Sequence, residues 1–158
     1  MNTLEVATYL ARPAKILIVE DCADVCCVLE QVIRKLGCES VTAMDGEEAI
    51  RQLRTNKFLA VVLDIRLPKI DGYGVLRYMR DAGCHLPVII LTAYADEQVY
   101  KLVDTYGVFG VLTKPFFVES LLQDLHRYFS IFRVKHAYPD SEQQGEVPPY
   151  TQALAAAT

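Results

Sequence analysis

Residues 61–72 read VVLDIRLPKIDG, a short apolar run that ends in the acid Asp64 and continues into a proline and an Asp-Gly pair. The run shows no alternation of apolar and polar positions, which indicates a strand buried on both faces, as in a parallel sheet. Proline followed by Asp-Gly is typical of a turn or loop. We therefore expect a buried strand that carries a carboxylate at its carboxyl end.

Apolar strands and amphipathic helices alternate on both sides of this run. Segments of strand length lie at 15–19, 39–43, 59–63, 87–91 and 108–112, and the pattern at 39–43 is the weakest. Helical periodicity follows each of them, at about 25–36, 45–53, 73–81, 96–106 and 117–132. Gly37 and Gly107 are helix stops, and Asp45 with Glu48 resembles a capping box. Five strand-helix units predict an α/β fold with a parallel sheet covered by helices on both faces.

The chain has 158 residues, enough for one domain with a sizeable core and too few for two ordinary ones. We expect that domain at residues 14–136. Residues 1–13 are expected to form a loose leader. Residues 137–158 are rich in Pro, Gln, Ala and small polar residues, which predicts a disordered tail or a truncated linker.

Composition argues against several classes of protein. The net charge of −4 and the pI near 5.4 provide no basic surface for nucleic acid. The longest apolar runs fall short of the roughly 18 residues of a membrane span, and no signal-peptide pattern begins the sequence, so we expect a cytoplasmic protein. The cysteines are odd in number and lack paired spacing, which predicts reduced thiols that serve as small apolar residues.

Polar residues follow four of the five expected strands: Glu20 and Asp21, Asp64, Thr92, and Lys114. The carboxyl ends of parallel strands meet at one edge of a sheet, and the binding crevice lies there, where the strand order reverses. Three carboxylates from two strands would repel one another unless a cation neutralised them. Oxygen ligands of this kind suit Mg²⁺. We therefore expect Asp64 to end its strand at the rim of a magnesium site.

The other two side chains suit phosphoryl chemistry. Lys114 supplies a mobile ammonium and Thr92 a hydroxyl that can donate to an oxyanion. Together with a cation they would form a receptor for a phosphoryl group carried on Asp64. Asp64 would then be the nucleophile that attacks phosphorus, forming a mixed acyl phosphate, while Mg²⁺ and Lys114 hold the developing charge.

Four motifs in this order, ILIVED, VVLDIRLPKIDG, VIILTA and VLTKPF, resemble those of the receiver domain of two-component response regulators, the CheY-like family. The resemblance covers residues 15 to about 132. It implies a flavodoxin-like (βα)5 fold with strand order 2-1-3-4-5 and phosphorylation by a sensor histidine kinase or a phosphotransfer protein. The output would be contact with a downstream protein, or homodimerisation, through the face of the fourth helix, fifth strand and fifth helix. Neither direct nucleic-acid binding by this chain nor membrane association is implied.

The same resemblance implies a role for each site residue. Asp64 would be the phospho-acceptor, Thr92 and Lys114 would bind the phosphoryl oxygens, and the bond between Lys114 and Pro115 would be cis. The implied metal ligands are Glu20 (directly or through water), Asp21, Asp64 and the backbone carbonyl of Arg66. The protein would be a signalling switch with only autophosphorylation and slow autodephosphorylation activity.

One position departs from the family pattern. The family usually has Tyr or Phe three residues before the lysine, and this chain has Val111, with Phe109 expected on the same strand face by parity. Either Tyr94 or Tyr106 substitutes for that aromatic, or the output surface responds more weakly. We also expect Arg66 and Tyr94 to flank the path of the attacking water and to slow hydrolysis of the phosphoryl group.

Two other functions share part of this sequence pattern. A phosphatase of the haloacid dehalogenase type needs a second acid two residues after its nucleophile, and Arg66 occupies that position. A receiver-like module that binds partners without phosphorylation is the second alternative: the presence of all the site residues argues against it, and the missing aromatic keeps it open. The sequence contains no effector domain, so it corresponds either to a stand-alone regulator or to a fragment of a larger one.

Overall fold

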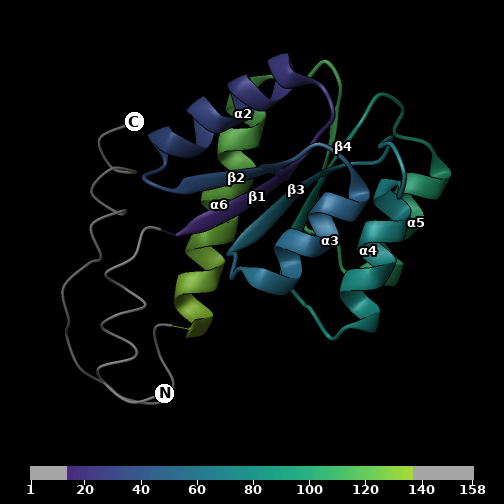
Figure 1. Cartoon of the computed structure of the whole chain (residues 1–158). Coiled ribbons are helices and arrows are strands. Elements are labelled where there is room, and N and C mark those ends of the chain that lie inside the picture. Colours follow the sequence, from purple (N-terminus) through teal and green to yellow (C-terminus); the bar gives the residue numbers. More distant parts are fainter. Residues whose placement is uncertain (1–13, 137–158) are drawn as a thin grey trace.

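The computed structural model describes the backbone of residues 14–136 and the side chains of residues 14–127. The expected leader at 1–13 and tail at 137–158 lie outside the described residues. Strands and helices alternate through the described part (Figure 1) in the order β1 (Lys15–Val19), α2 (Ala23–Lys35), β2 (Glu39–Ala43), α3 (Gly46–Thr55), β3 (Ala60–Asp64), α4 (Gly72–Asp81), β4 (Val88–Thr92), α5 (Glu97–Tyr106), β5 (Gly110–Thr113) and α6 (Val118–His136).

All strand pairs are parallel, and the sheet order is β2-β1-β3-β4-β5. The flavodoxin-like architecture and strand order are therefore confirmed. The chain moves outward from β1 to β2 and then crosses to β3 on the other side of β1, so the order reverses between β1 and β3. Val19 and Leu63 are partners in the register of these two strands, which places the residues after them side by side.

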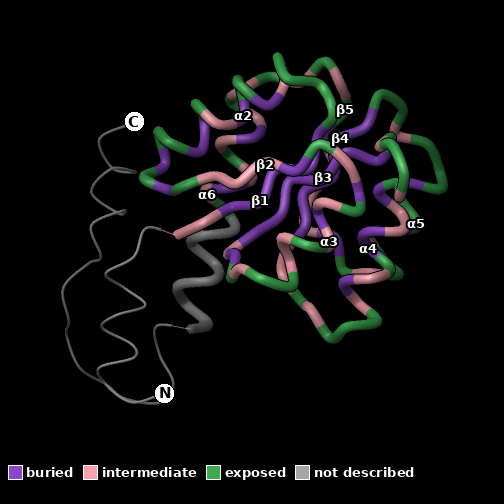
Figure 2. The backbone as a smooth tube through the Cα atoms, in the orientation of Figure 1, coloured by how far each residue is buried: buried purple, intermediate pink, exposed green. Residues whose placement is uncertain are grey.

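Two helical layers cover the sheet, α2 and α6 on one face and α3, α4 and α5 on the other (Figure 1). Every residue of β3 and β4 is buried, and Figure 2 shows these strands as the buried centre of the molecule. This confirms that an apolar run without alternation marks a strand covered on both faces. Within residues 14–136, no helix combines the length and hydropathy needed to span a membrane.

Three helices begin at an aspartate cap, of which the sequence predicted the one at Asp45. An aspartate caps each of α3, α4 and α5, and its side chain accepts the backbone N–H three residues further on: Asp45 from Glu48, Asp71 from Gly74 and Asp96 from Val99. The capping box at α3 is displaced by one residue, because Glu48 accepts the N–H of Met44 rather than that of Asp45.

The fifth strand differs from its prediction. It begins at Gly110 rather than Val108, so Phe109 precedes the strand and strand parity does not apply to it. Val111 packs against the core under α3, α4 and α5, whereas Phe109 packs against the core under α2 and α6. The guanidinium of Arg127 lies 5.1 Å from the Phe109 ring centre. The expectation that Phe109 and Val111 share a face is therefore wrong.

The cysteines are all free, in agreement with the prediction of reduced thiols. Cys26 and Cys38 are buried like small apolar residues, and burial raises the pKa of each thiol to about 11. Cys22 and Cys27 are exposed, so for these two the apolar role is wrong. Cys22 is the N-cap residue that precedes α2, and Cys27 lies on the face of α2 that is turned to solvent.

Candidate functional site

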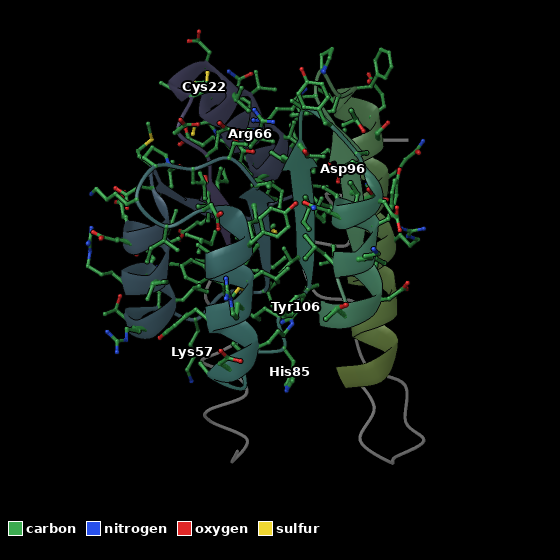
Figure 3. All side chains as sticks on the ribbon, turned by 90° about the vertical axis from the view of Figure 1, so that its right-hand side faces the viewer. Cys22, Lys57, Arg66, His85, Asp96 and Tyr106 are labelled. Atoms are coloured by element: carbon green, nitrogen blue, oxygen red, sulfur yellow. The ribbon has the colours of Figure 1, made fainter. Side chains whose placement is uncertain are left out.

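The three predicted carboxylates meet at the carboxyl edge of the sheet. Glu20 and Asp21 follow β1, and Asp64 is the last residue of β3. One oxygen from each carboxylate lies within 4.8 Å of the others. Figure 3 shows Arg66 and Asp96 at this edge, while Lys57 and His85 lie at the opposite one. The predicted convergence of acids from two neighbouring strands is present in the structure.

Lys114 bridges the two buried acids of this cluster. Its Nζ lies 2.6 Å from Glu20 Oε2 and 2.9 Å from Asp64 Oδ2. The lysine follows β5, where its N–H donates to the Thr92 carbonyl at the end of β4, and its bond to Pro115 is cis. The side chain thus spans from the far edge of the sheet to the switch point between β1 and β3.

Each buried acid also accepts a backbone N–H from the residue two positions further on. Cys22 N–H donates to Glu20 Oε1 at 3.1 Å, and Arg66 N–H donates to Asp64 Oδ1 at 3.1 Å. The strand has ended at both places, so these amides are not used by the sheet and are available to the carboxylates. Asp21, in contrast, is exposed.

The electrostatics of the cluster favour a further cation. Burial, with the charge of Asp64, raises the pKa of Glu20 although Lys114 and the Cys22 N–H act against it. Burial lowers the pKa of Lys114, but the two carboxylates outweigh it and the net pKa is raised. Three carboxylates against one ammonium leave an excess of negative charge. Hard oxygen donors with excess negative charge fit a divalent cation such as Mg²⁺.

Thr92 ends β4 beside this cluster and is buried. Its hydroxyl donates to the Tyr94 carbonyl at 2.9 Å and accepts the Tyr94 N–H at 3.1 Å. The Arg66 guanidinium lies over the Tyr94 ring, 5.4 Å from its centre. The Thr92 hydroxyl proton is therefore engaged by the following loop in this structure.

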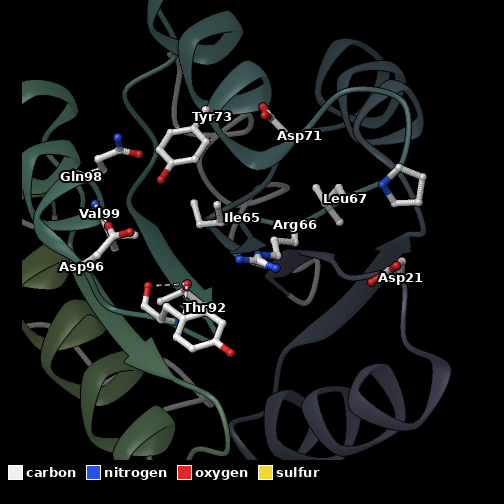
Figure 4. A pocket seen from close by; sticks show the side chains of 12 residues that line it. Asp21, Ile65, Arg66, Leu67, Asp71, Tyr73, Thr92, Asp96, Gln98 and Val99 are labelled. Carbon is white, nitrogen blue, oxygen red and sulfur yellow. Dashed lines mark hydrogen bonds between the residues drawn. The ribbon is translucent and has the colours of Figure 1, made fainter.

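A cleft of about 570 Å³ opens next to Thr92, between the loops that precede α4 and α5. Figure 4 shows Asp21, Arg66 and Thr92 around it, with Tyr73 and Asp96 further along the wall. Tyr94 also lines the cleft. The cleft thus reaches the exposed acid of the cluster, Asp21.

The loop after Asp64 is held against the start of α3. Lys69, at a φ of 63°, pairs with Asp45 at 2.8 Å, and the Gly46 N–H donates to the Pro68 carbonyl. A Cβ on Gly46 would lie 1.9 Å from the backbone oxygen of Ile70. Only glycine allows this approach, which keeps the loop between β3 and α4 in place.

The structure brings together Glu20, Asp21, Asp64 and Lys114, and places Thr92 on the adjoining cleft. The Arg66 carbonyl as a metal ligand stays a prediction. Sequence reasoning missed the direct contact between Glu20 and Lys114. It also missed the tie between Lys69 and Asp45, for which the sequence offers no signal beyond the Asp-Gly pair at α3.

Comparison with known proteins agrees with this geometry. Residues 16–126 match the family model of the response regulator receiver domain. The chain is 31% identical over 137 residues to the alkaline phosphatase synthesis transcriptional regulatory protein PhoP of Bacillus subtilis, with 84% of this chain and 57% of that protein covered. The chain spans about half the length of the curated relatives it matches.

Two solved structures are also similar. A putative response regulator from Chloroflexus aurantiacus is 33% identical with a TM-score of 0.68, over 75% of this chain and 99% of that one. The chemotaxis protein CheY4 of Vibrio cholerae is 27% identical with a TM-score of 0.68, over 74% and 99% of the two chains. With the fold, the acid cluster and the family match in agreement, this chain belongs to the receiver domain family of two-component response regulators, signalling switches whose family function is phosphorylation-dependent switching.

Proposed function

We propose that Asp64 is the phospho-acceptor of this receiver and that the reaction depends on Mg²⁺. The observation that carries the proposal is the position of Lys114, whose Nζ contacts Asp64 and Glu20 within a cluster of three carboxylates. A lysine between two buried acids, at the edge of the sheet where the strand order reverses, suits a site that receives an anion.

In the proposed reaction an Asp64 oxygen attacks the phosphorus of a phosphohistidine on a histidine kinase or phosphotransfer protein. The new P–O bond forms as the P–N bond breaks, and the imidazole leaves with its electron pair and takes a proton. Slow hydrolysis by water at phosphorus then releases phosphate and restores the carboxylate. Autophosphorylation from a small acyl phosphate follows the same course with a carboxylate as the leaving group.

The residues of this chain would act by position and charge. The ammonium of Lys114, which contacts Asp64 Oδ2 in this structure, would bind a phosphoryl oxygen after transfer. Thr92 would donate its hydroxyl to another phosphoryl oxygen. The proposed holders of Mg²⁺ are Glu20, Asp21, Asp64 and the Arg66 carbonyl. When bound, the ion would neutralise charge on the phosphoryl oxygens.

The proposed partners rest on the family to which the chain belongs and on the residues that α5 exposes to solvent. The output would pass to a downstream protein or to a second copy through α5, β5 and α6. On α5, Tyr100 is 56% exposed, and Lys101 pairs with Glu97 on the surface. Tyr106 packs against the core instead, so it contributes less to such a face. Residues 14–136 as the receiver domain, a cytoplasmic location and the absence of direct nucleic-acid binding by this chain stay predictions.

The test is to incubate the protein with Mg²⁺ and acetyl phosphate, or with the phosphoryl mimic beryllofluoride, and to record mass, NMR shifts and oligomeric state. We expect one added phosphoryl group and a set of shifted signals, both absent in Asp64→Asn. Val111 in place of the usual aromatic favours one competing function, a module that binds partners without phosphorylation. Absence of any change that depends on Asp64 would favour that function.

A further inference from the structure

We propose that Tyr94 reports the state of Asp64 in this chain, and that Arg66 holds the unphosphorylated arrangement by stacking on the Tyr94 ring. The inference rests on the phosphorylation of Asp64 proposed above. It assigns to these two residues a positioning role that acts on the Thr92 hydroxyl.

The first step is a competition for one proton. A threonine hydroxyl has a single hydrogen to donate, and Thr92 gives it to the Tyr94 carbonyl at 2.9 Å. Thr92 is 5% exposed, so water offers little alternative. Donation to a phosphoryl oxygen on Asp64 therefore requires that the hydroxyl release the Tyr94 carbonyl. The two arrangements exclude each other.

The Tyr94 ring is held in place by Arg66. Tyr94 is 66% exposed and packs against neither core, so the core does not fix its ring. The Arg66 guanidinium lies 5.4 Å from the ring centre, within the range of a cation–π contact. Arg66 is in turn tied to Asp64 by its backbone N–H at 3.1 Å. A chain of contacts thus runs from Asp64 through Arg66 and Tyr94 to Thr92, across the ends of β3 and β4.

A change at Tyr94 would be passed on to helix α5. Val111 packs against the core, and β5 therefore lacks the aromatic ring that the family usually has at this position. Tyr94 instead lies two residues before Asp96, which caps the start of α5 through the Val99 N–H at 3.0 Å. When the Thr92 hydroxyl releases the Tyr94 carbonyl, the resulting shift would therefore reach α5 through Asp96, the residue that caps this helix.

Linkage gives the size and sign of the effect. If the stack favours the unphosphorylated arrangement, removing it must raise affinity for a phosphoryl mimic by the same factor. An exposed cation–π contact corresponds to roughly a two- to fivefold change. Tyr94→Leu and Arg66→Met should each raise the affinity for beryllofluoride in Mg²⁺ by about this factor, and the double variant should gain no more than either one.

Two controls separate the stack from general loosening. Tyr94→Phe keeps the ring and should bind the mimic as the unsubstituted protein does. Arg77→Met alters an exposed arginine of α4 and should also leave the affinity unchanged. A direct readout is the NMR signal of the Arg66 Nε–H, which the Tyr94 ring shields. Beryllofluoride should move this signal to the position that it has in Tyr94→Leu without the mimic.

The outcomes distinguish this inference from the function on which it rests. Loss of mimic binding in Asp64→Asn, with unchanged affinity in Tyr94→Leu and Arg66→Met, would overturn the inference and leave the proposed function standing. A shorter phospho-form lifetime in both variants without a gain in mimic affinity would show only a shield against water, and would also overturn it. Failure of the unsubstituted protein to bind the mimic would refute the proposed function first.

Discussion

Replacing Lys114 by methionine would leave two buried carboxylates without their cation. The side chains of Glu20 and Asp64 are 1% and 7% exposed, and each would keep a single backbone N–H donor. Loss of one partner from a buried ion pair costs about 3–5 kcal/mol. Lys114 is 24% exposed and Asp21 faces solvent, so water can relieve part of the charge. We therefore expect Lys114→Met to lower the free energy of unfolding by about 2–3 kcal/mol at neutral pH.

The assay is urea unfolding followed by circular dichroism, with a chelator and then with excess Mg²⁺. An ion that binds the folded state stabilises it by mass action, and it would replace the missing positive charge. Mg²⁺ should therefore restore more stability to Lys114→Met than it adds to the unsubstituted protein. Lys101→Met is the matched control, because Lys101 and Glu97 are 69% and 83% exposed and their pair should contribute below about 0.5 kcal/mol.

The pH dependence has a defined sign. Burial already raises the pKa of Glu20 above 4.5, and removal of Lys114 should raise it further. For an acid with a raised folded-state pKa, the penalty is absent below the unfolded value and grows as pH rises through the folded one. The difference between Lys114→Met and the unsubstituted protein should thus shrink as pH falls toward 4.5. A loss below about 0.5 kcal/mol that is constant with pH would refute the electrostatic reasoning.

Three further substitutions test other contacts. Arg80→Met should cost about 2–4 kcal/mol in urea unfolding, because its guanidinium donates to the carbonyls of Cys84, Leu86 and Tyr106; a loss under about 1 kcal/mol would contradict this. Gly46→Ala should cost more than about 2 kcal/mol and weaken Mg²⁺ binding measured by titration calorimetry, because its Cβ would lie 1.9 Å from the Ile70 oxygen. Gly110→Ala, which meets only the movable Asp124 carboxylate, is the milder control.

The third is Lys69→Met, which should lower the urea midpoint at neutral pH. Lys69 and the Glu48 N–H lower the pKa of Asp45, so the contribution of the pair is present above the unfolded value of 3.8 and is lost as pH falls through the folded one. Midpoints measured over a pH series should converge at acid pH. If the urea midpoints of Lys69→Met and the unsubstituted protein still differed at acid pH, the ion pair between Lys69 and Asp45 would not be the source of the difference.

Local sequence patterns predicted some helices, strands and site residues better than others. The runs at β3 and β4 and the aspartate cap of α3 carry their structure in a few adjacent residues, and each was predicted to within one residue. The start of β5 was not, because Val108 and Phe109 are apolar like the strand but lie before its first residue, in opposite cores. Apolar character alone does not separate a strand from the buried turn that leads into it.

The alternation of buried strands and amphipathic helices is enough to dictate a parallel sheet with acids at one edge, because strand direction sends every carboxyl end the same way. The choice of contacts within that edge depends on loops that are distant in the chain. The span of Lys114 from β5 to both Glu20 and Asp64, the tie of Lys69 to Asp45 and the stack of Arg66 on Tyr94 all join such loops. Their partners are selected by packing and desolvation in the folded state, which no local spacing encodes.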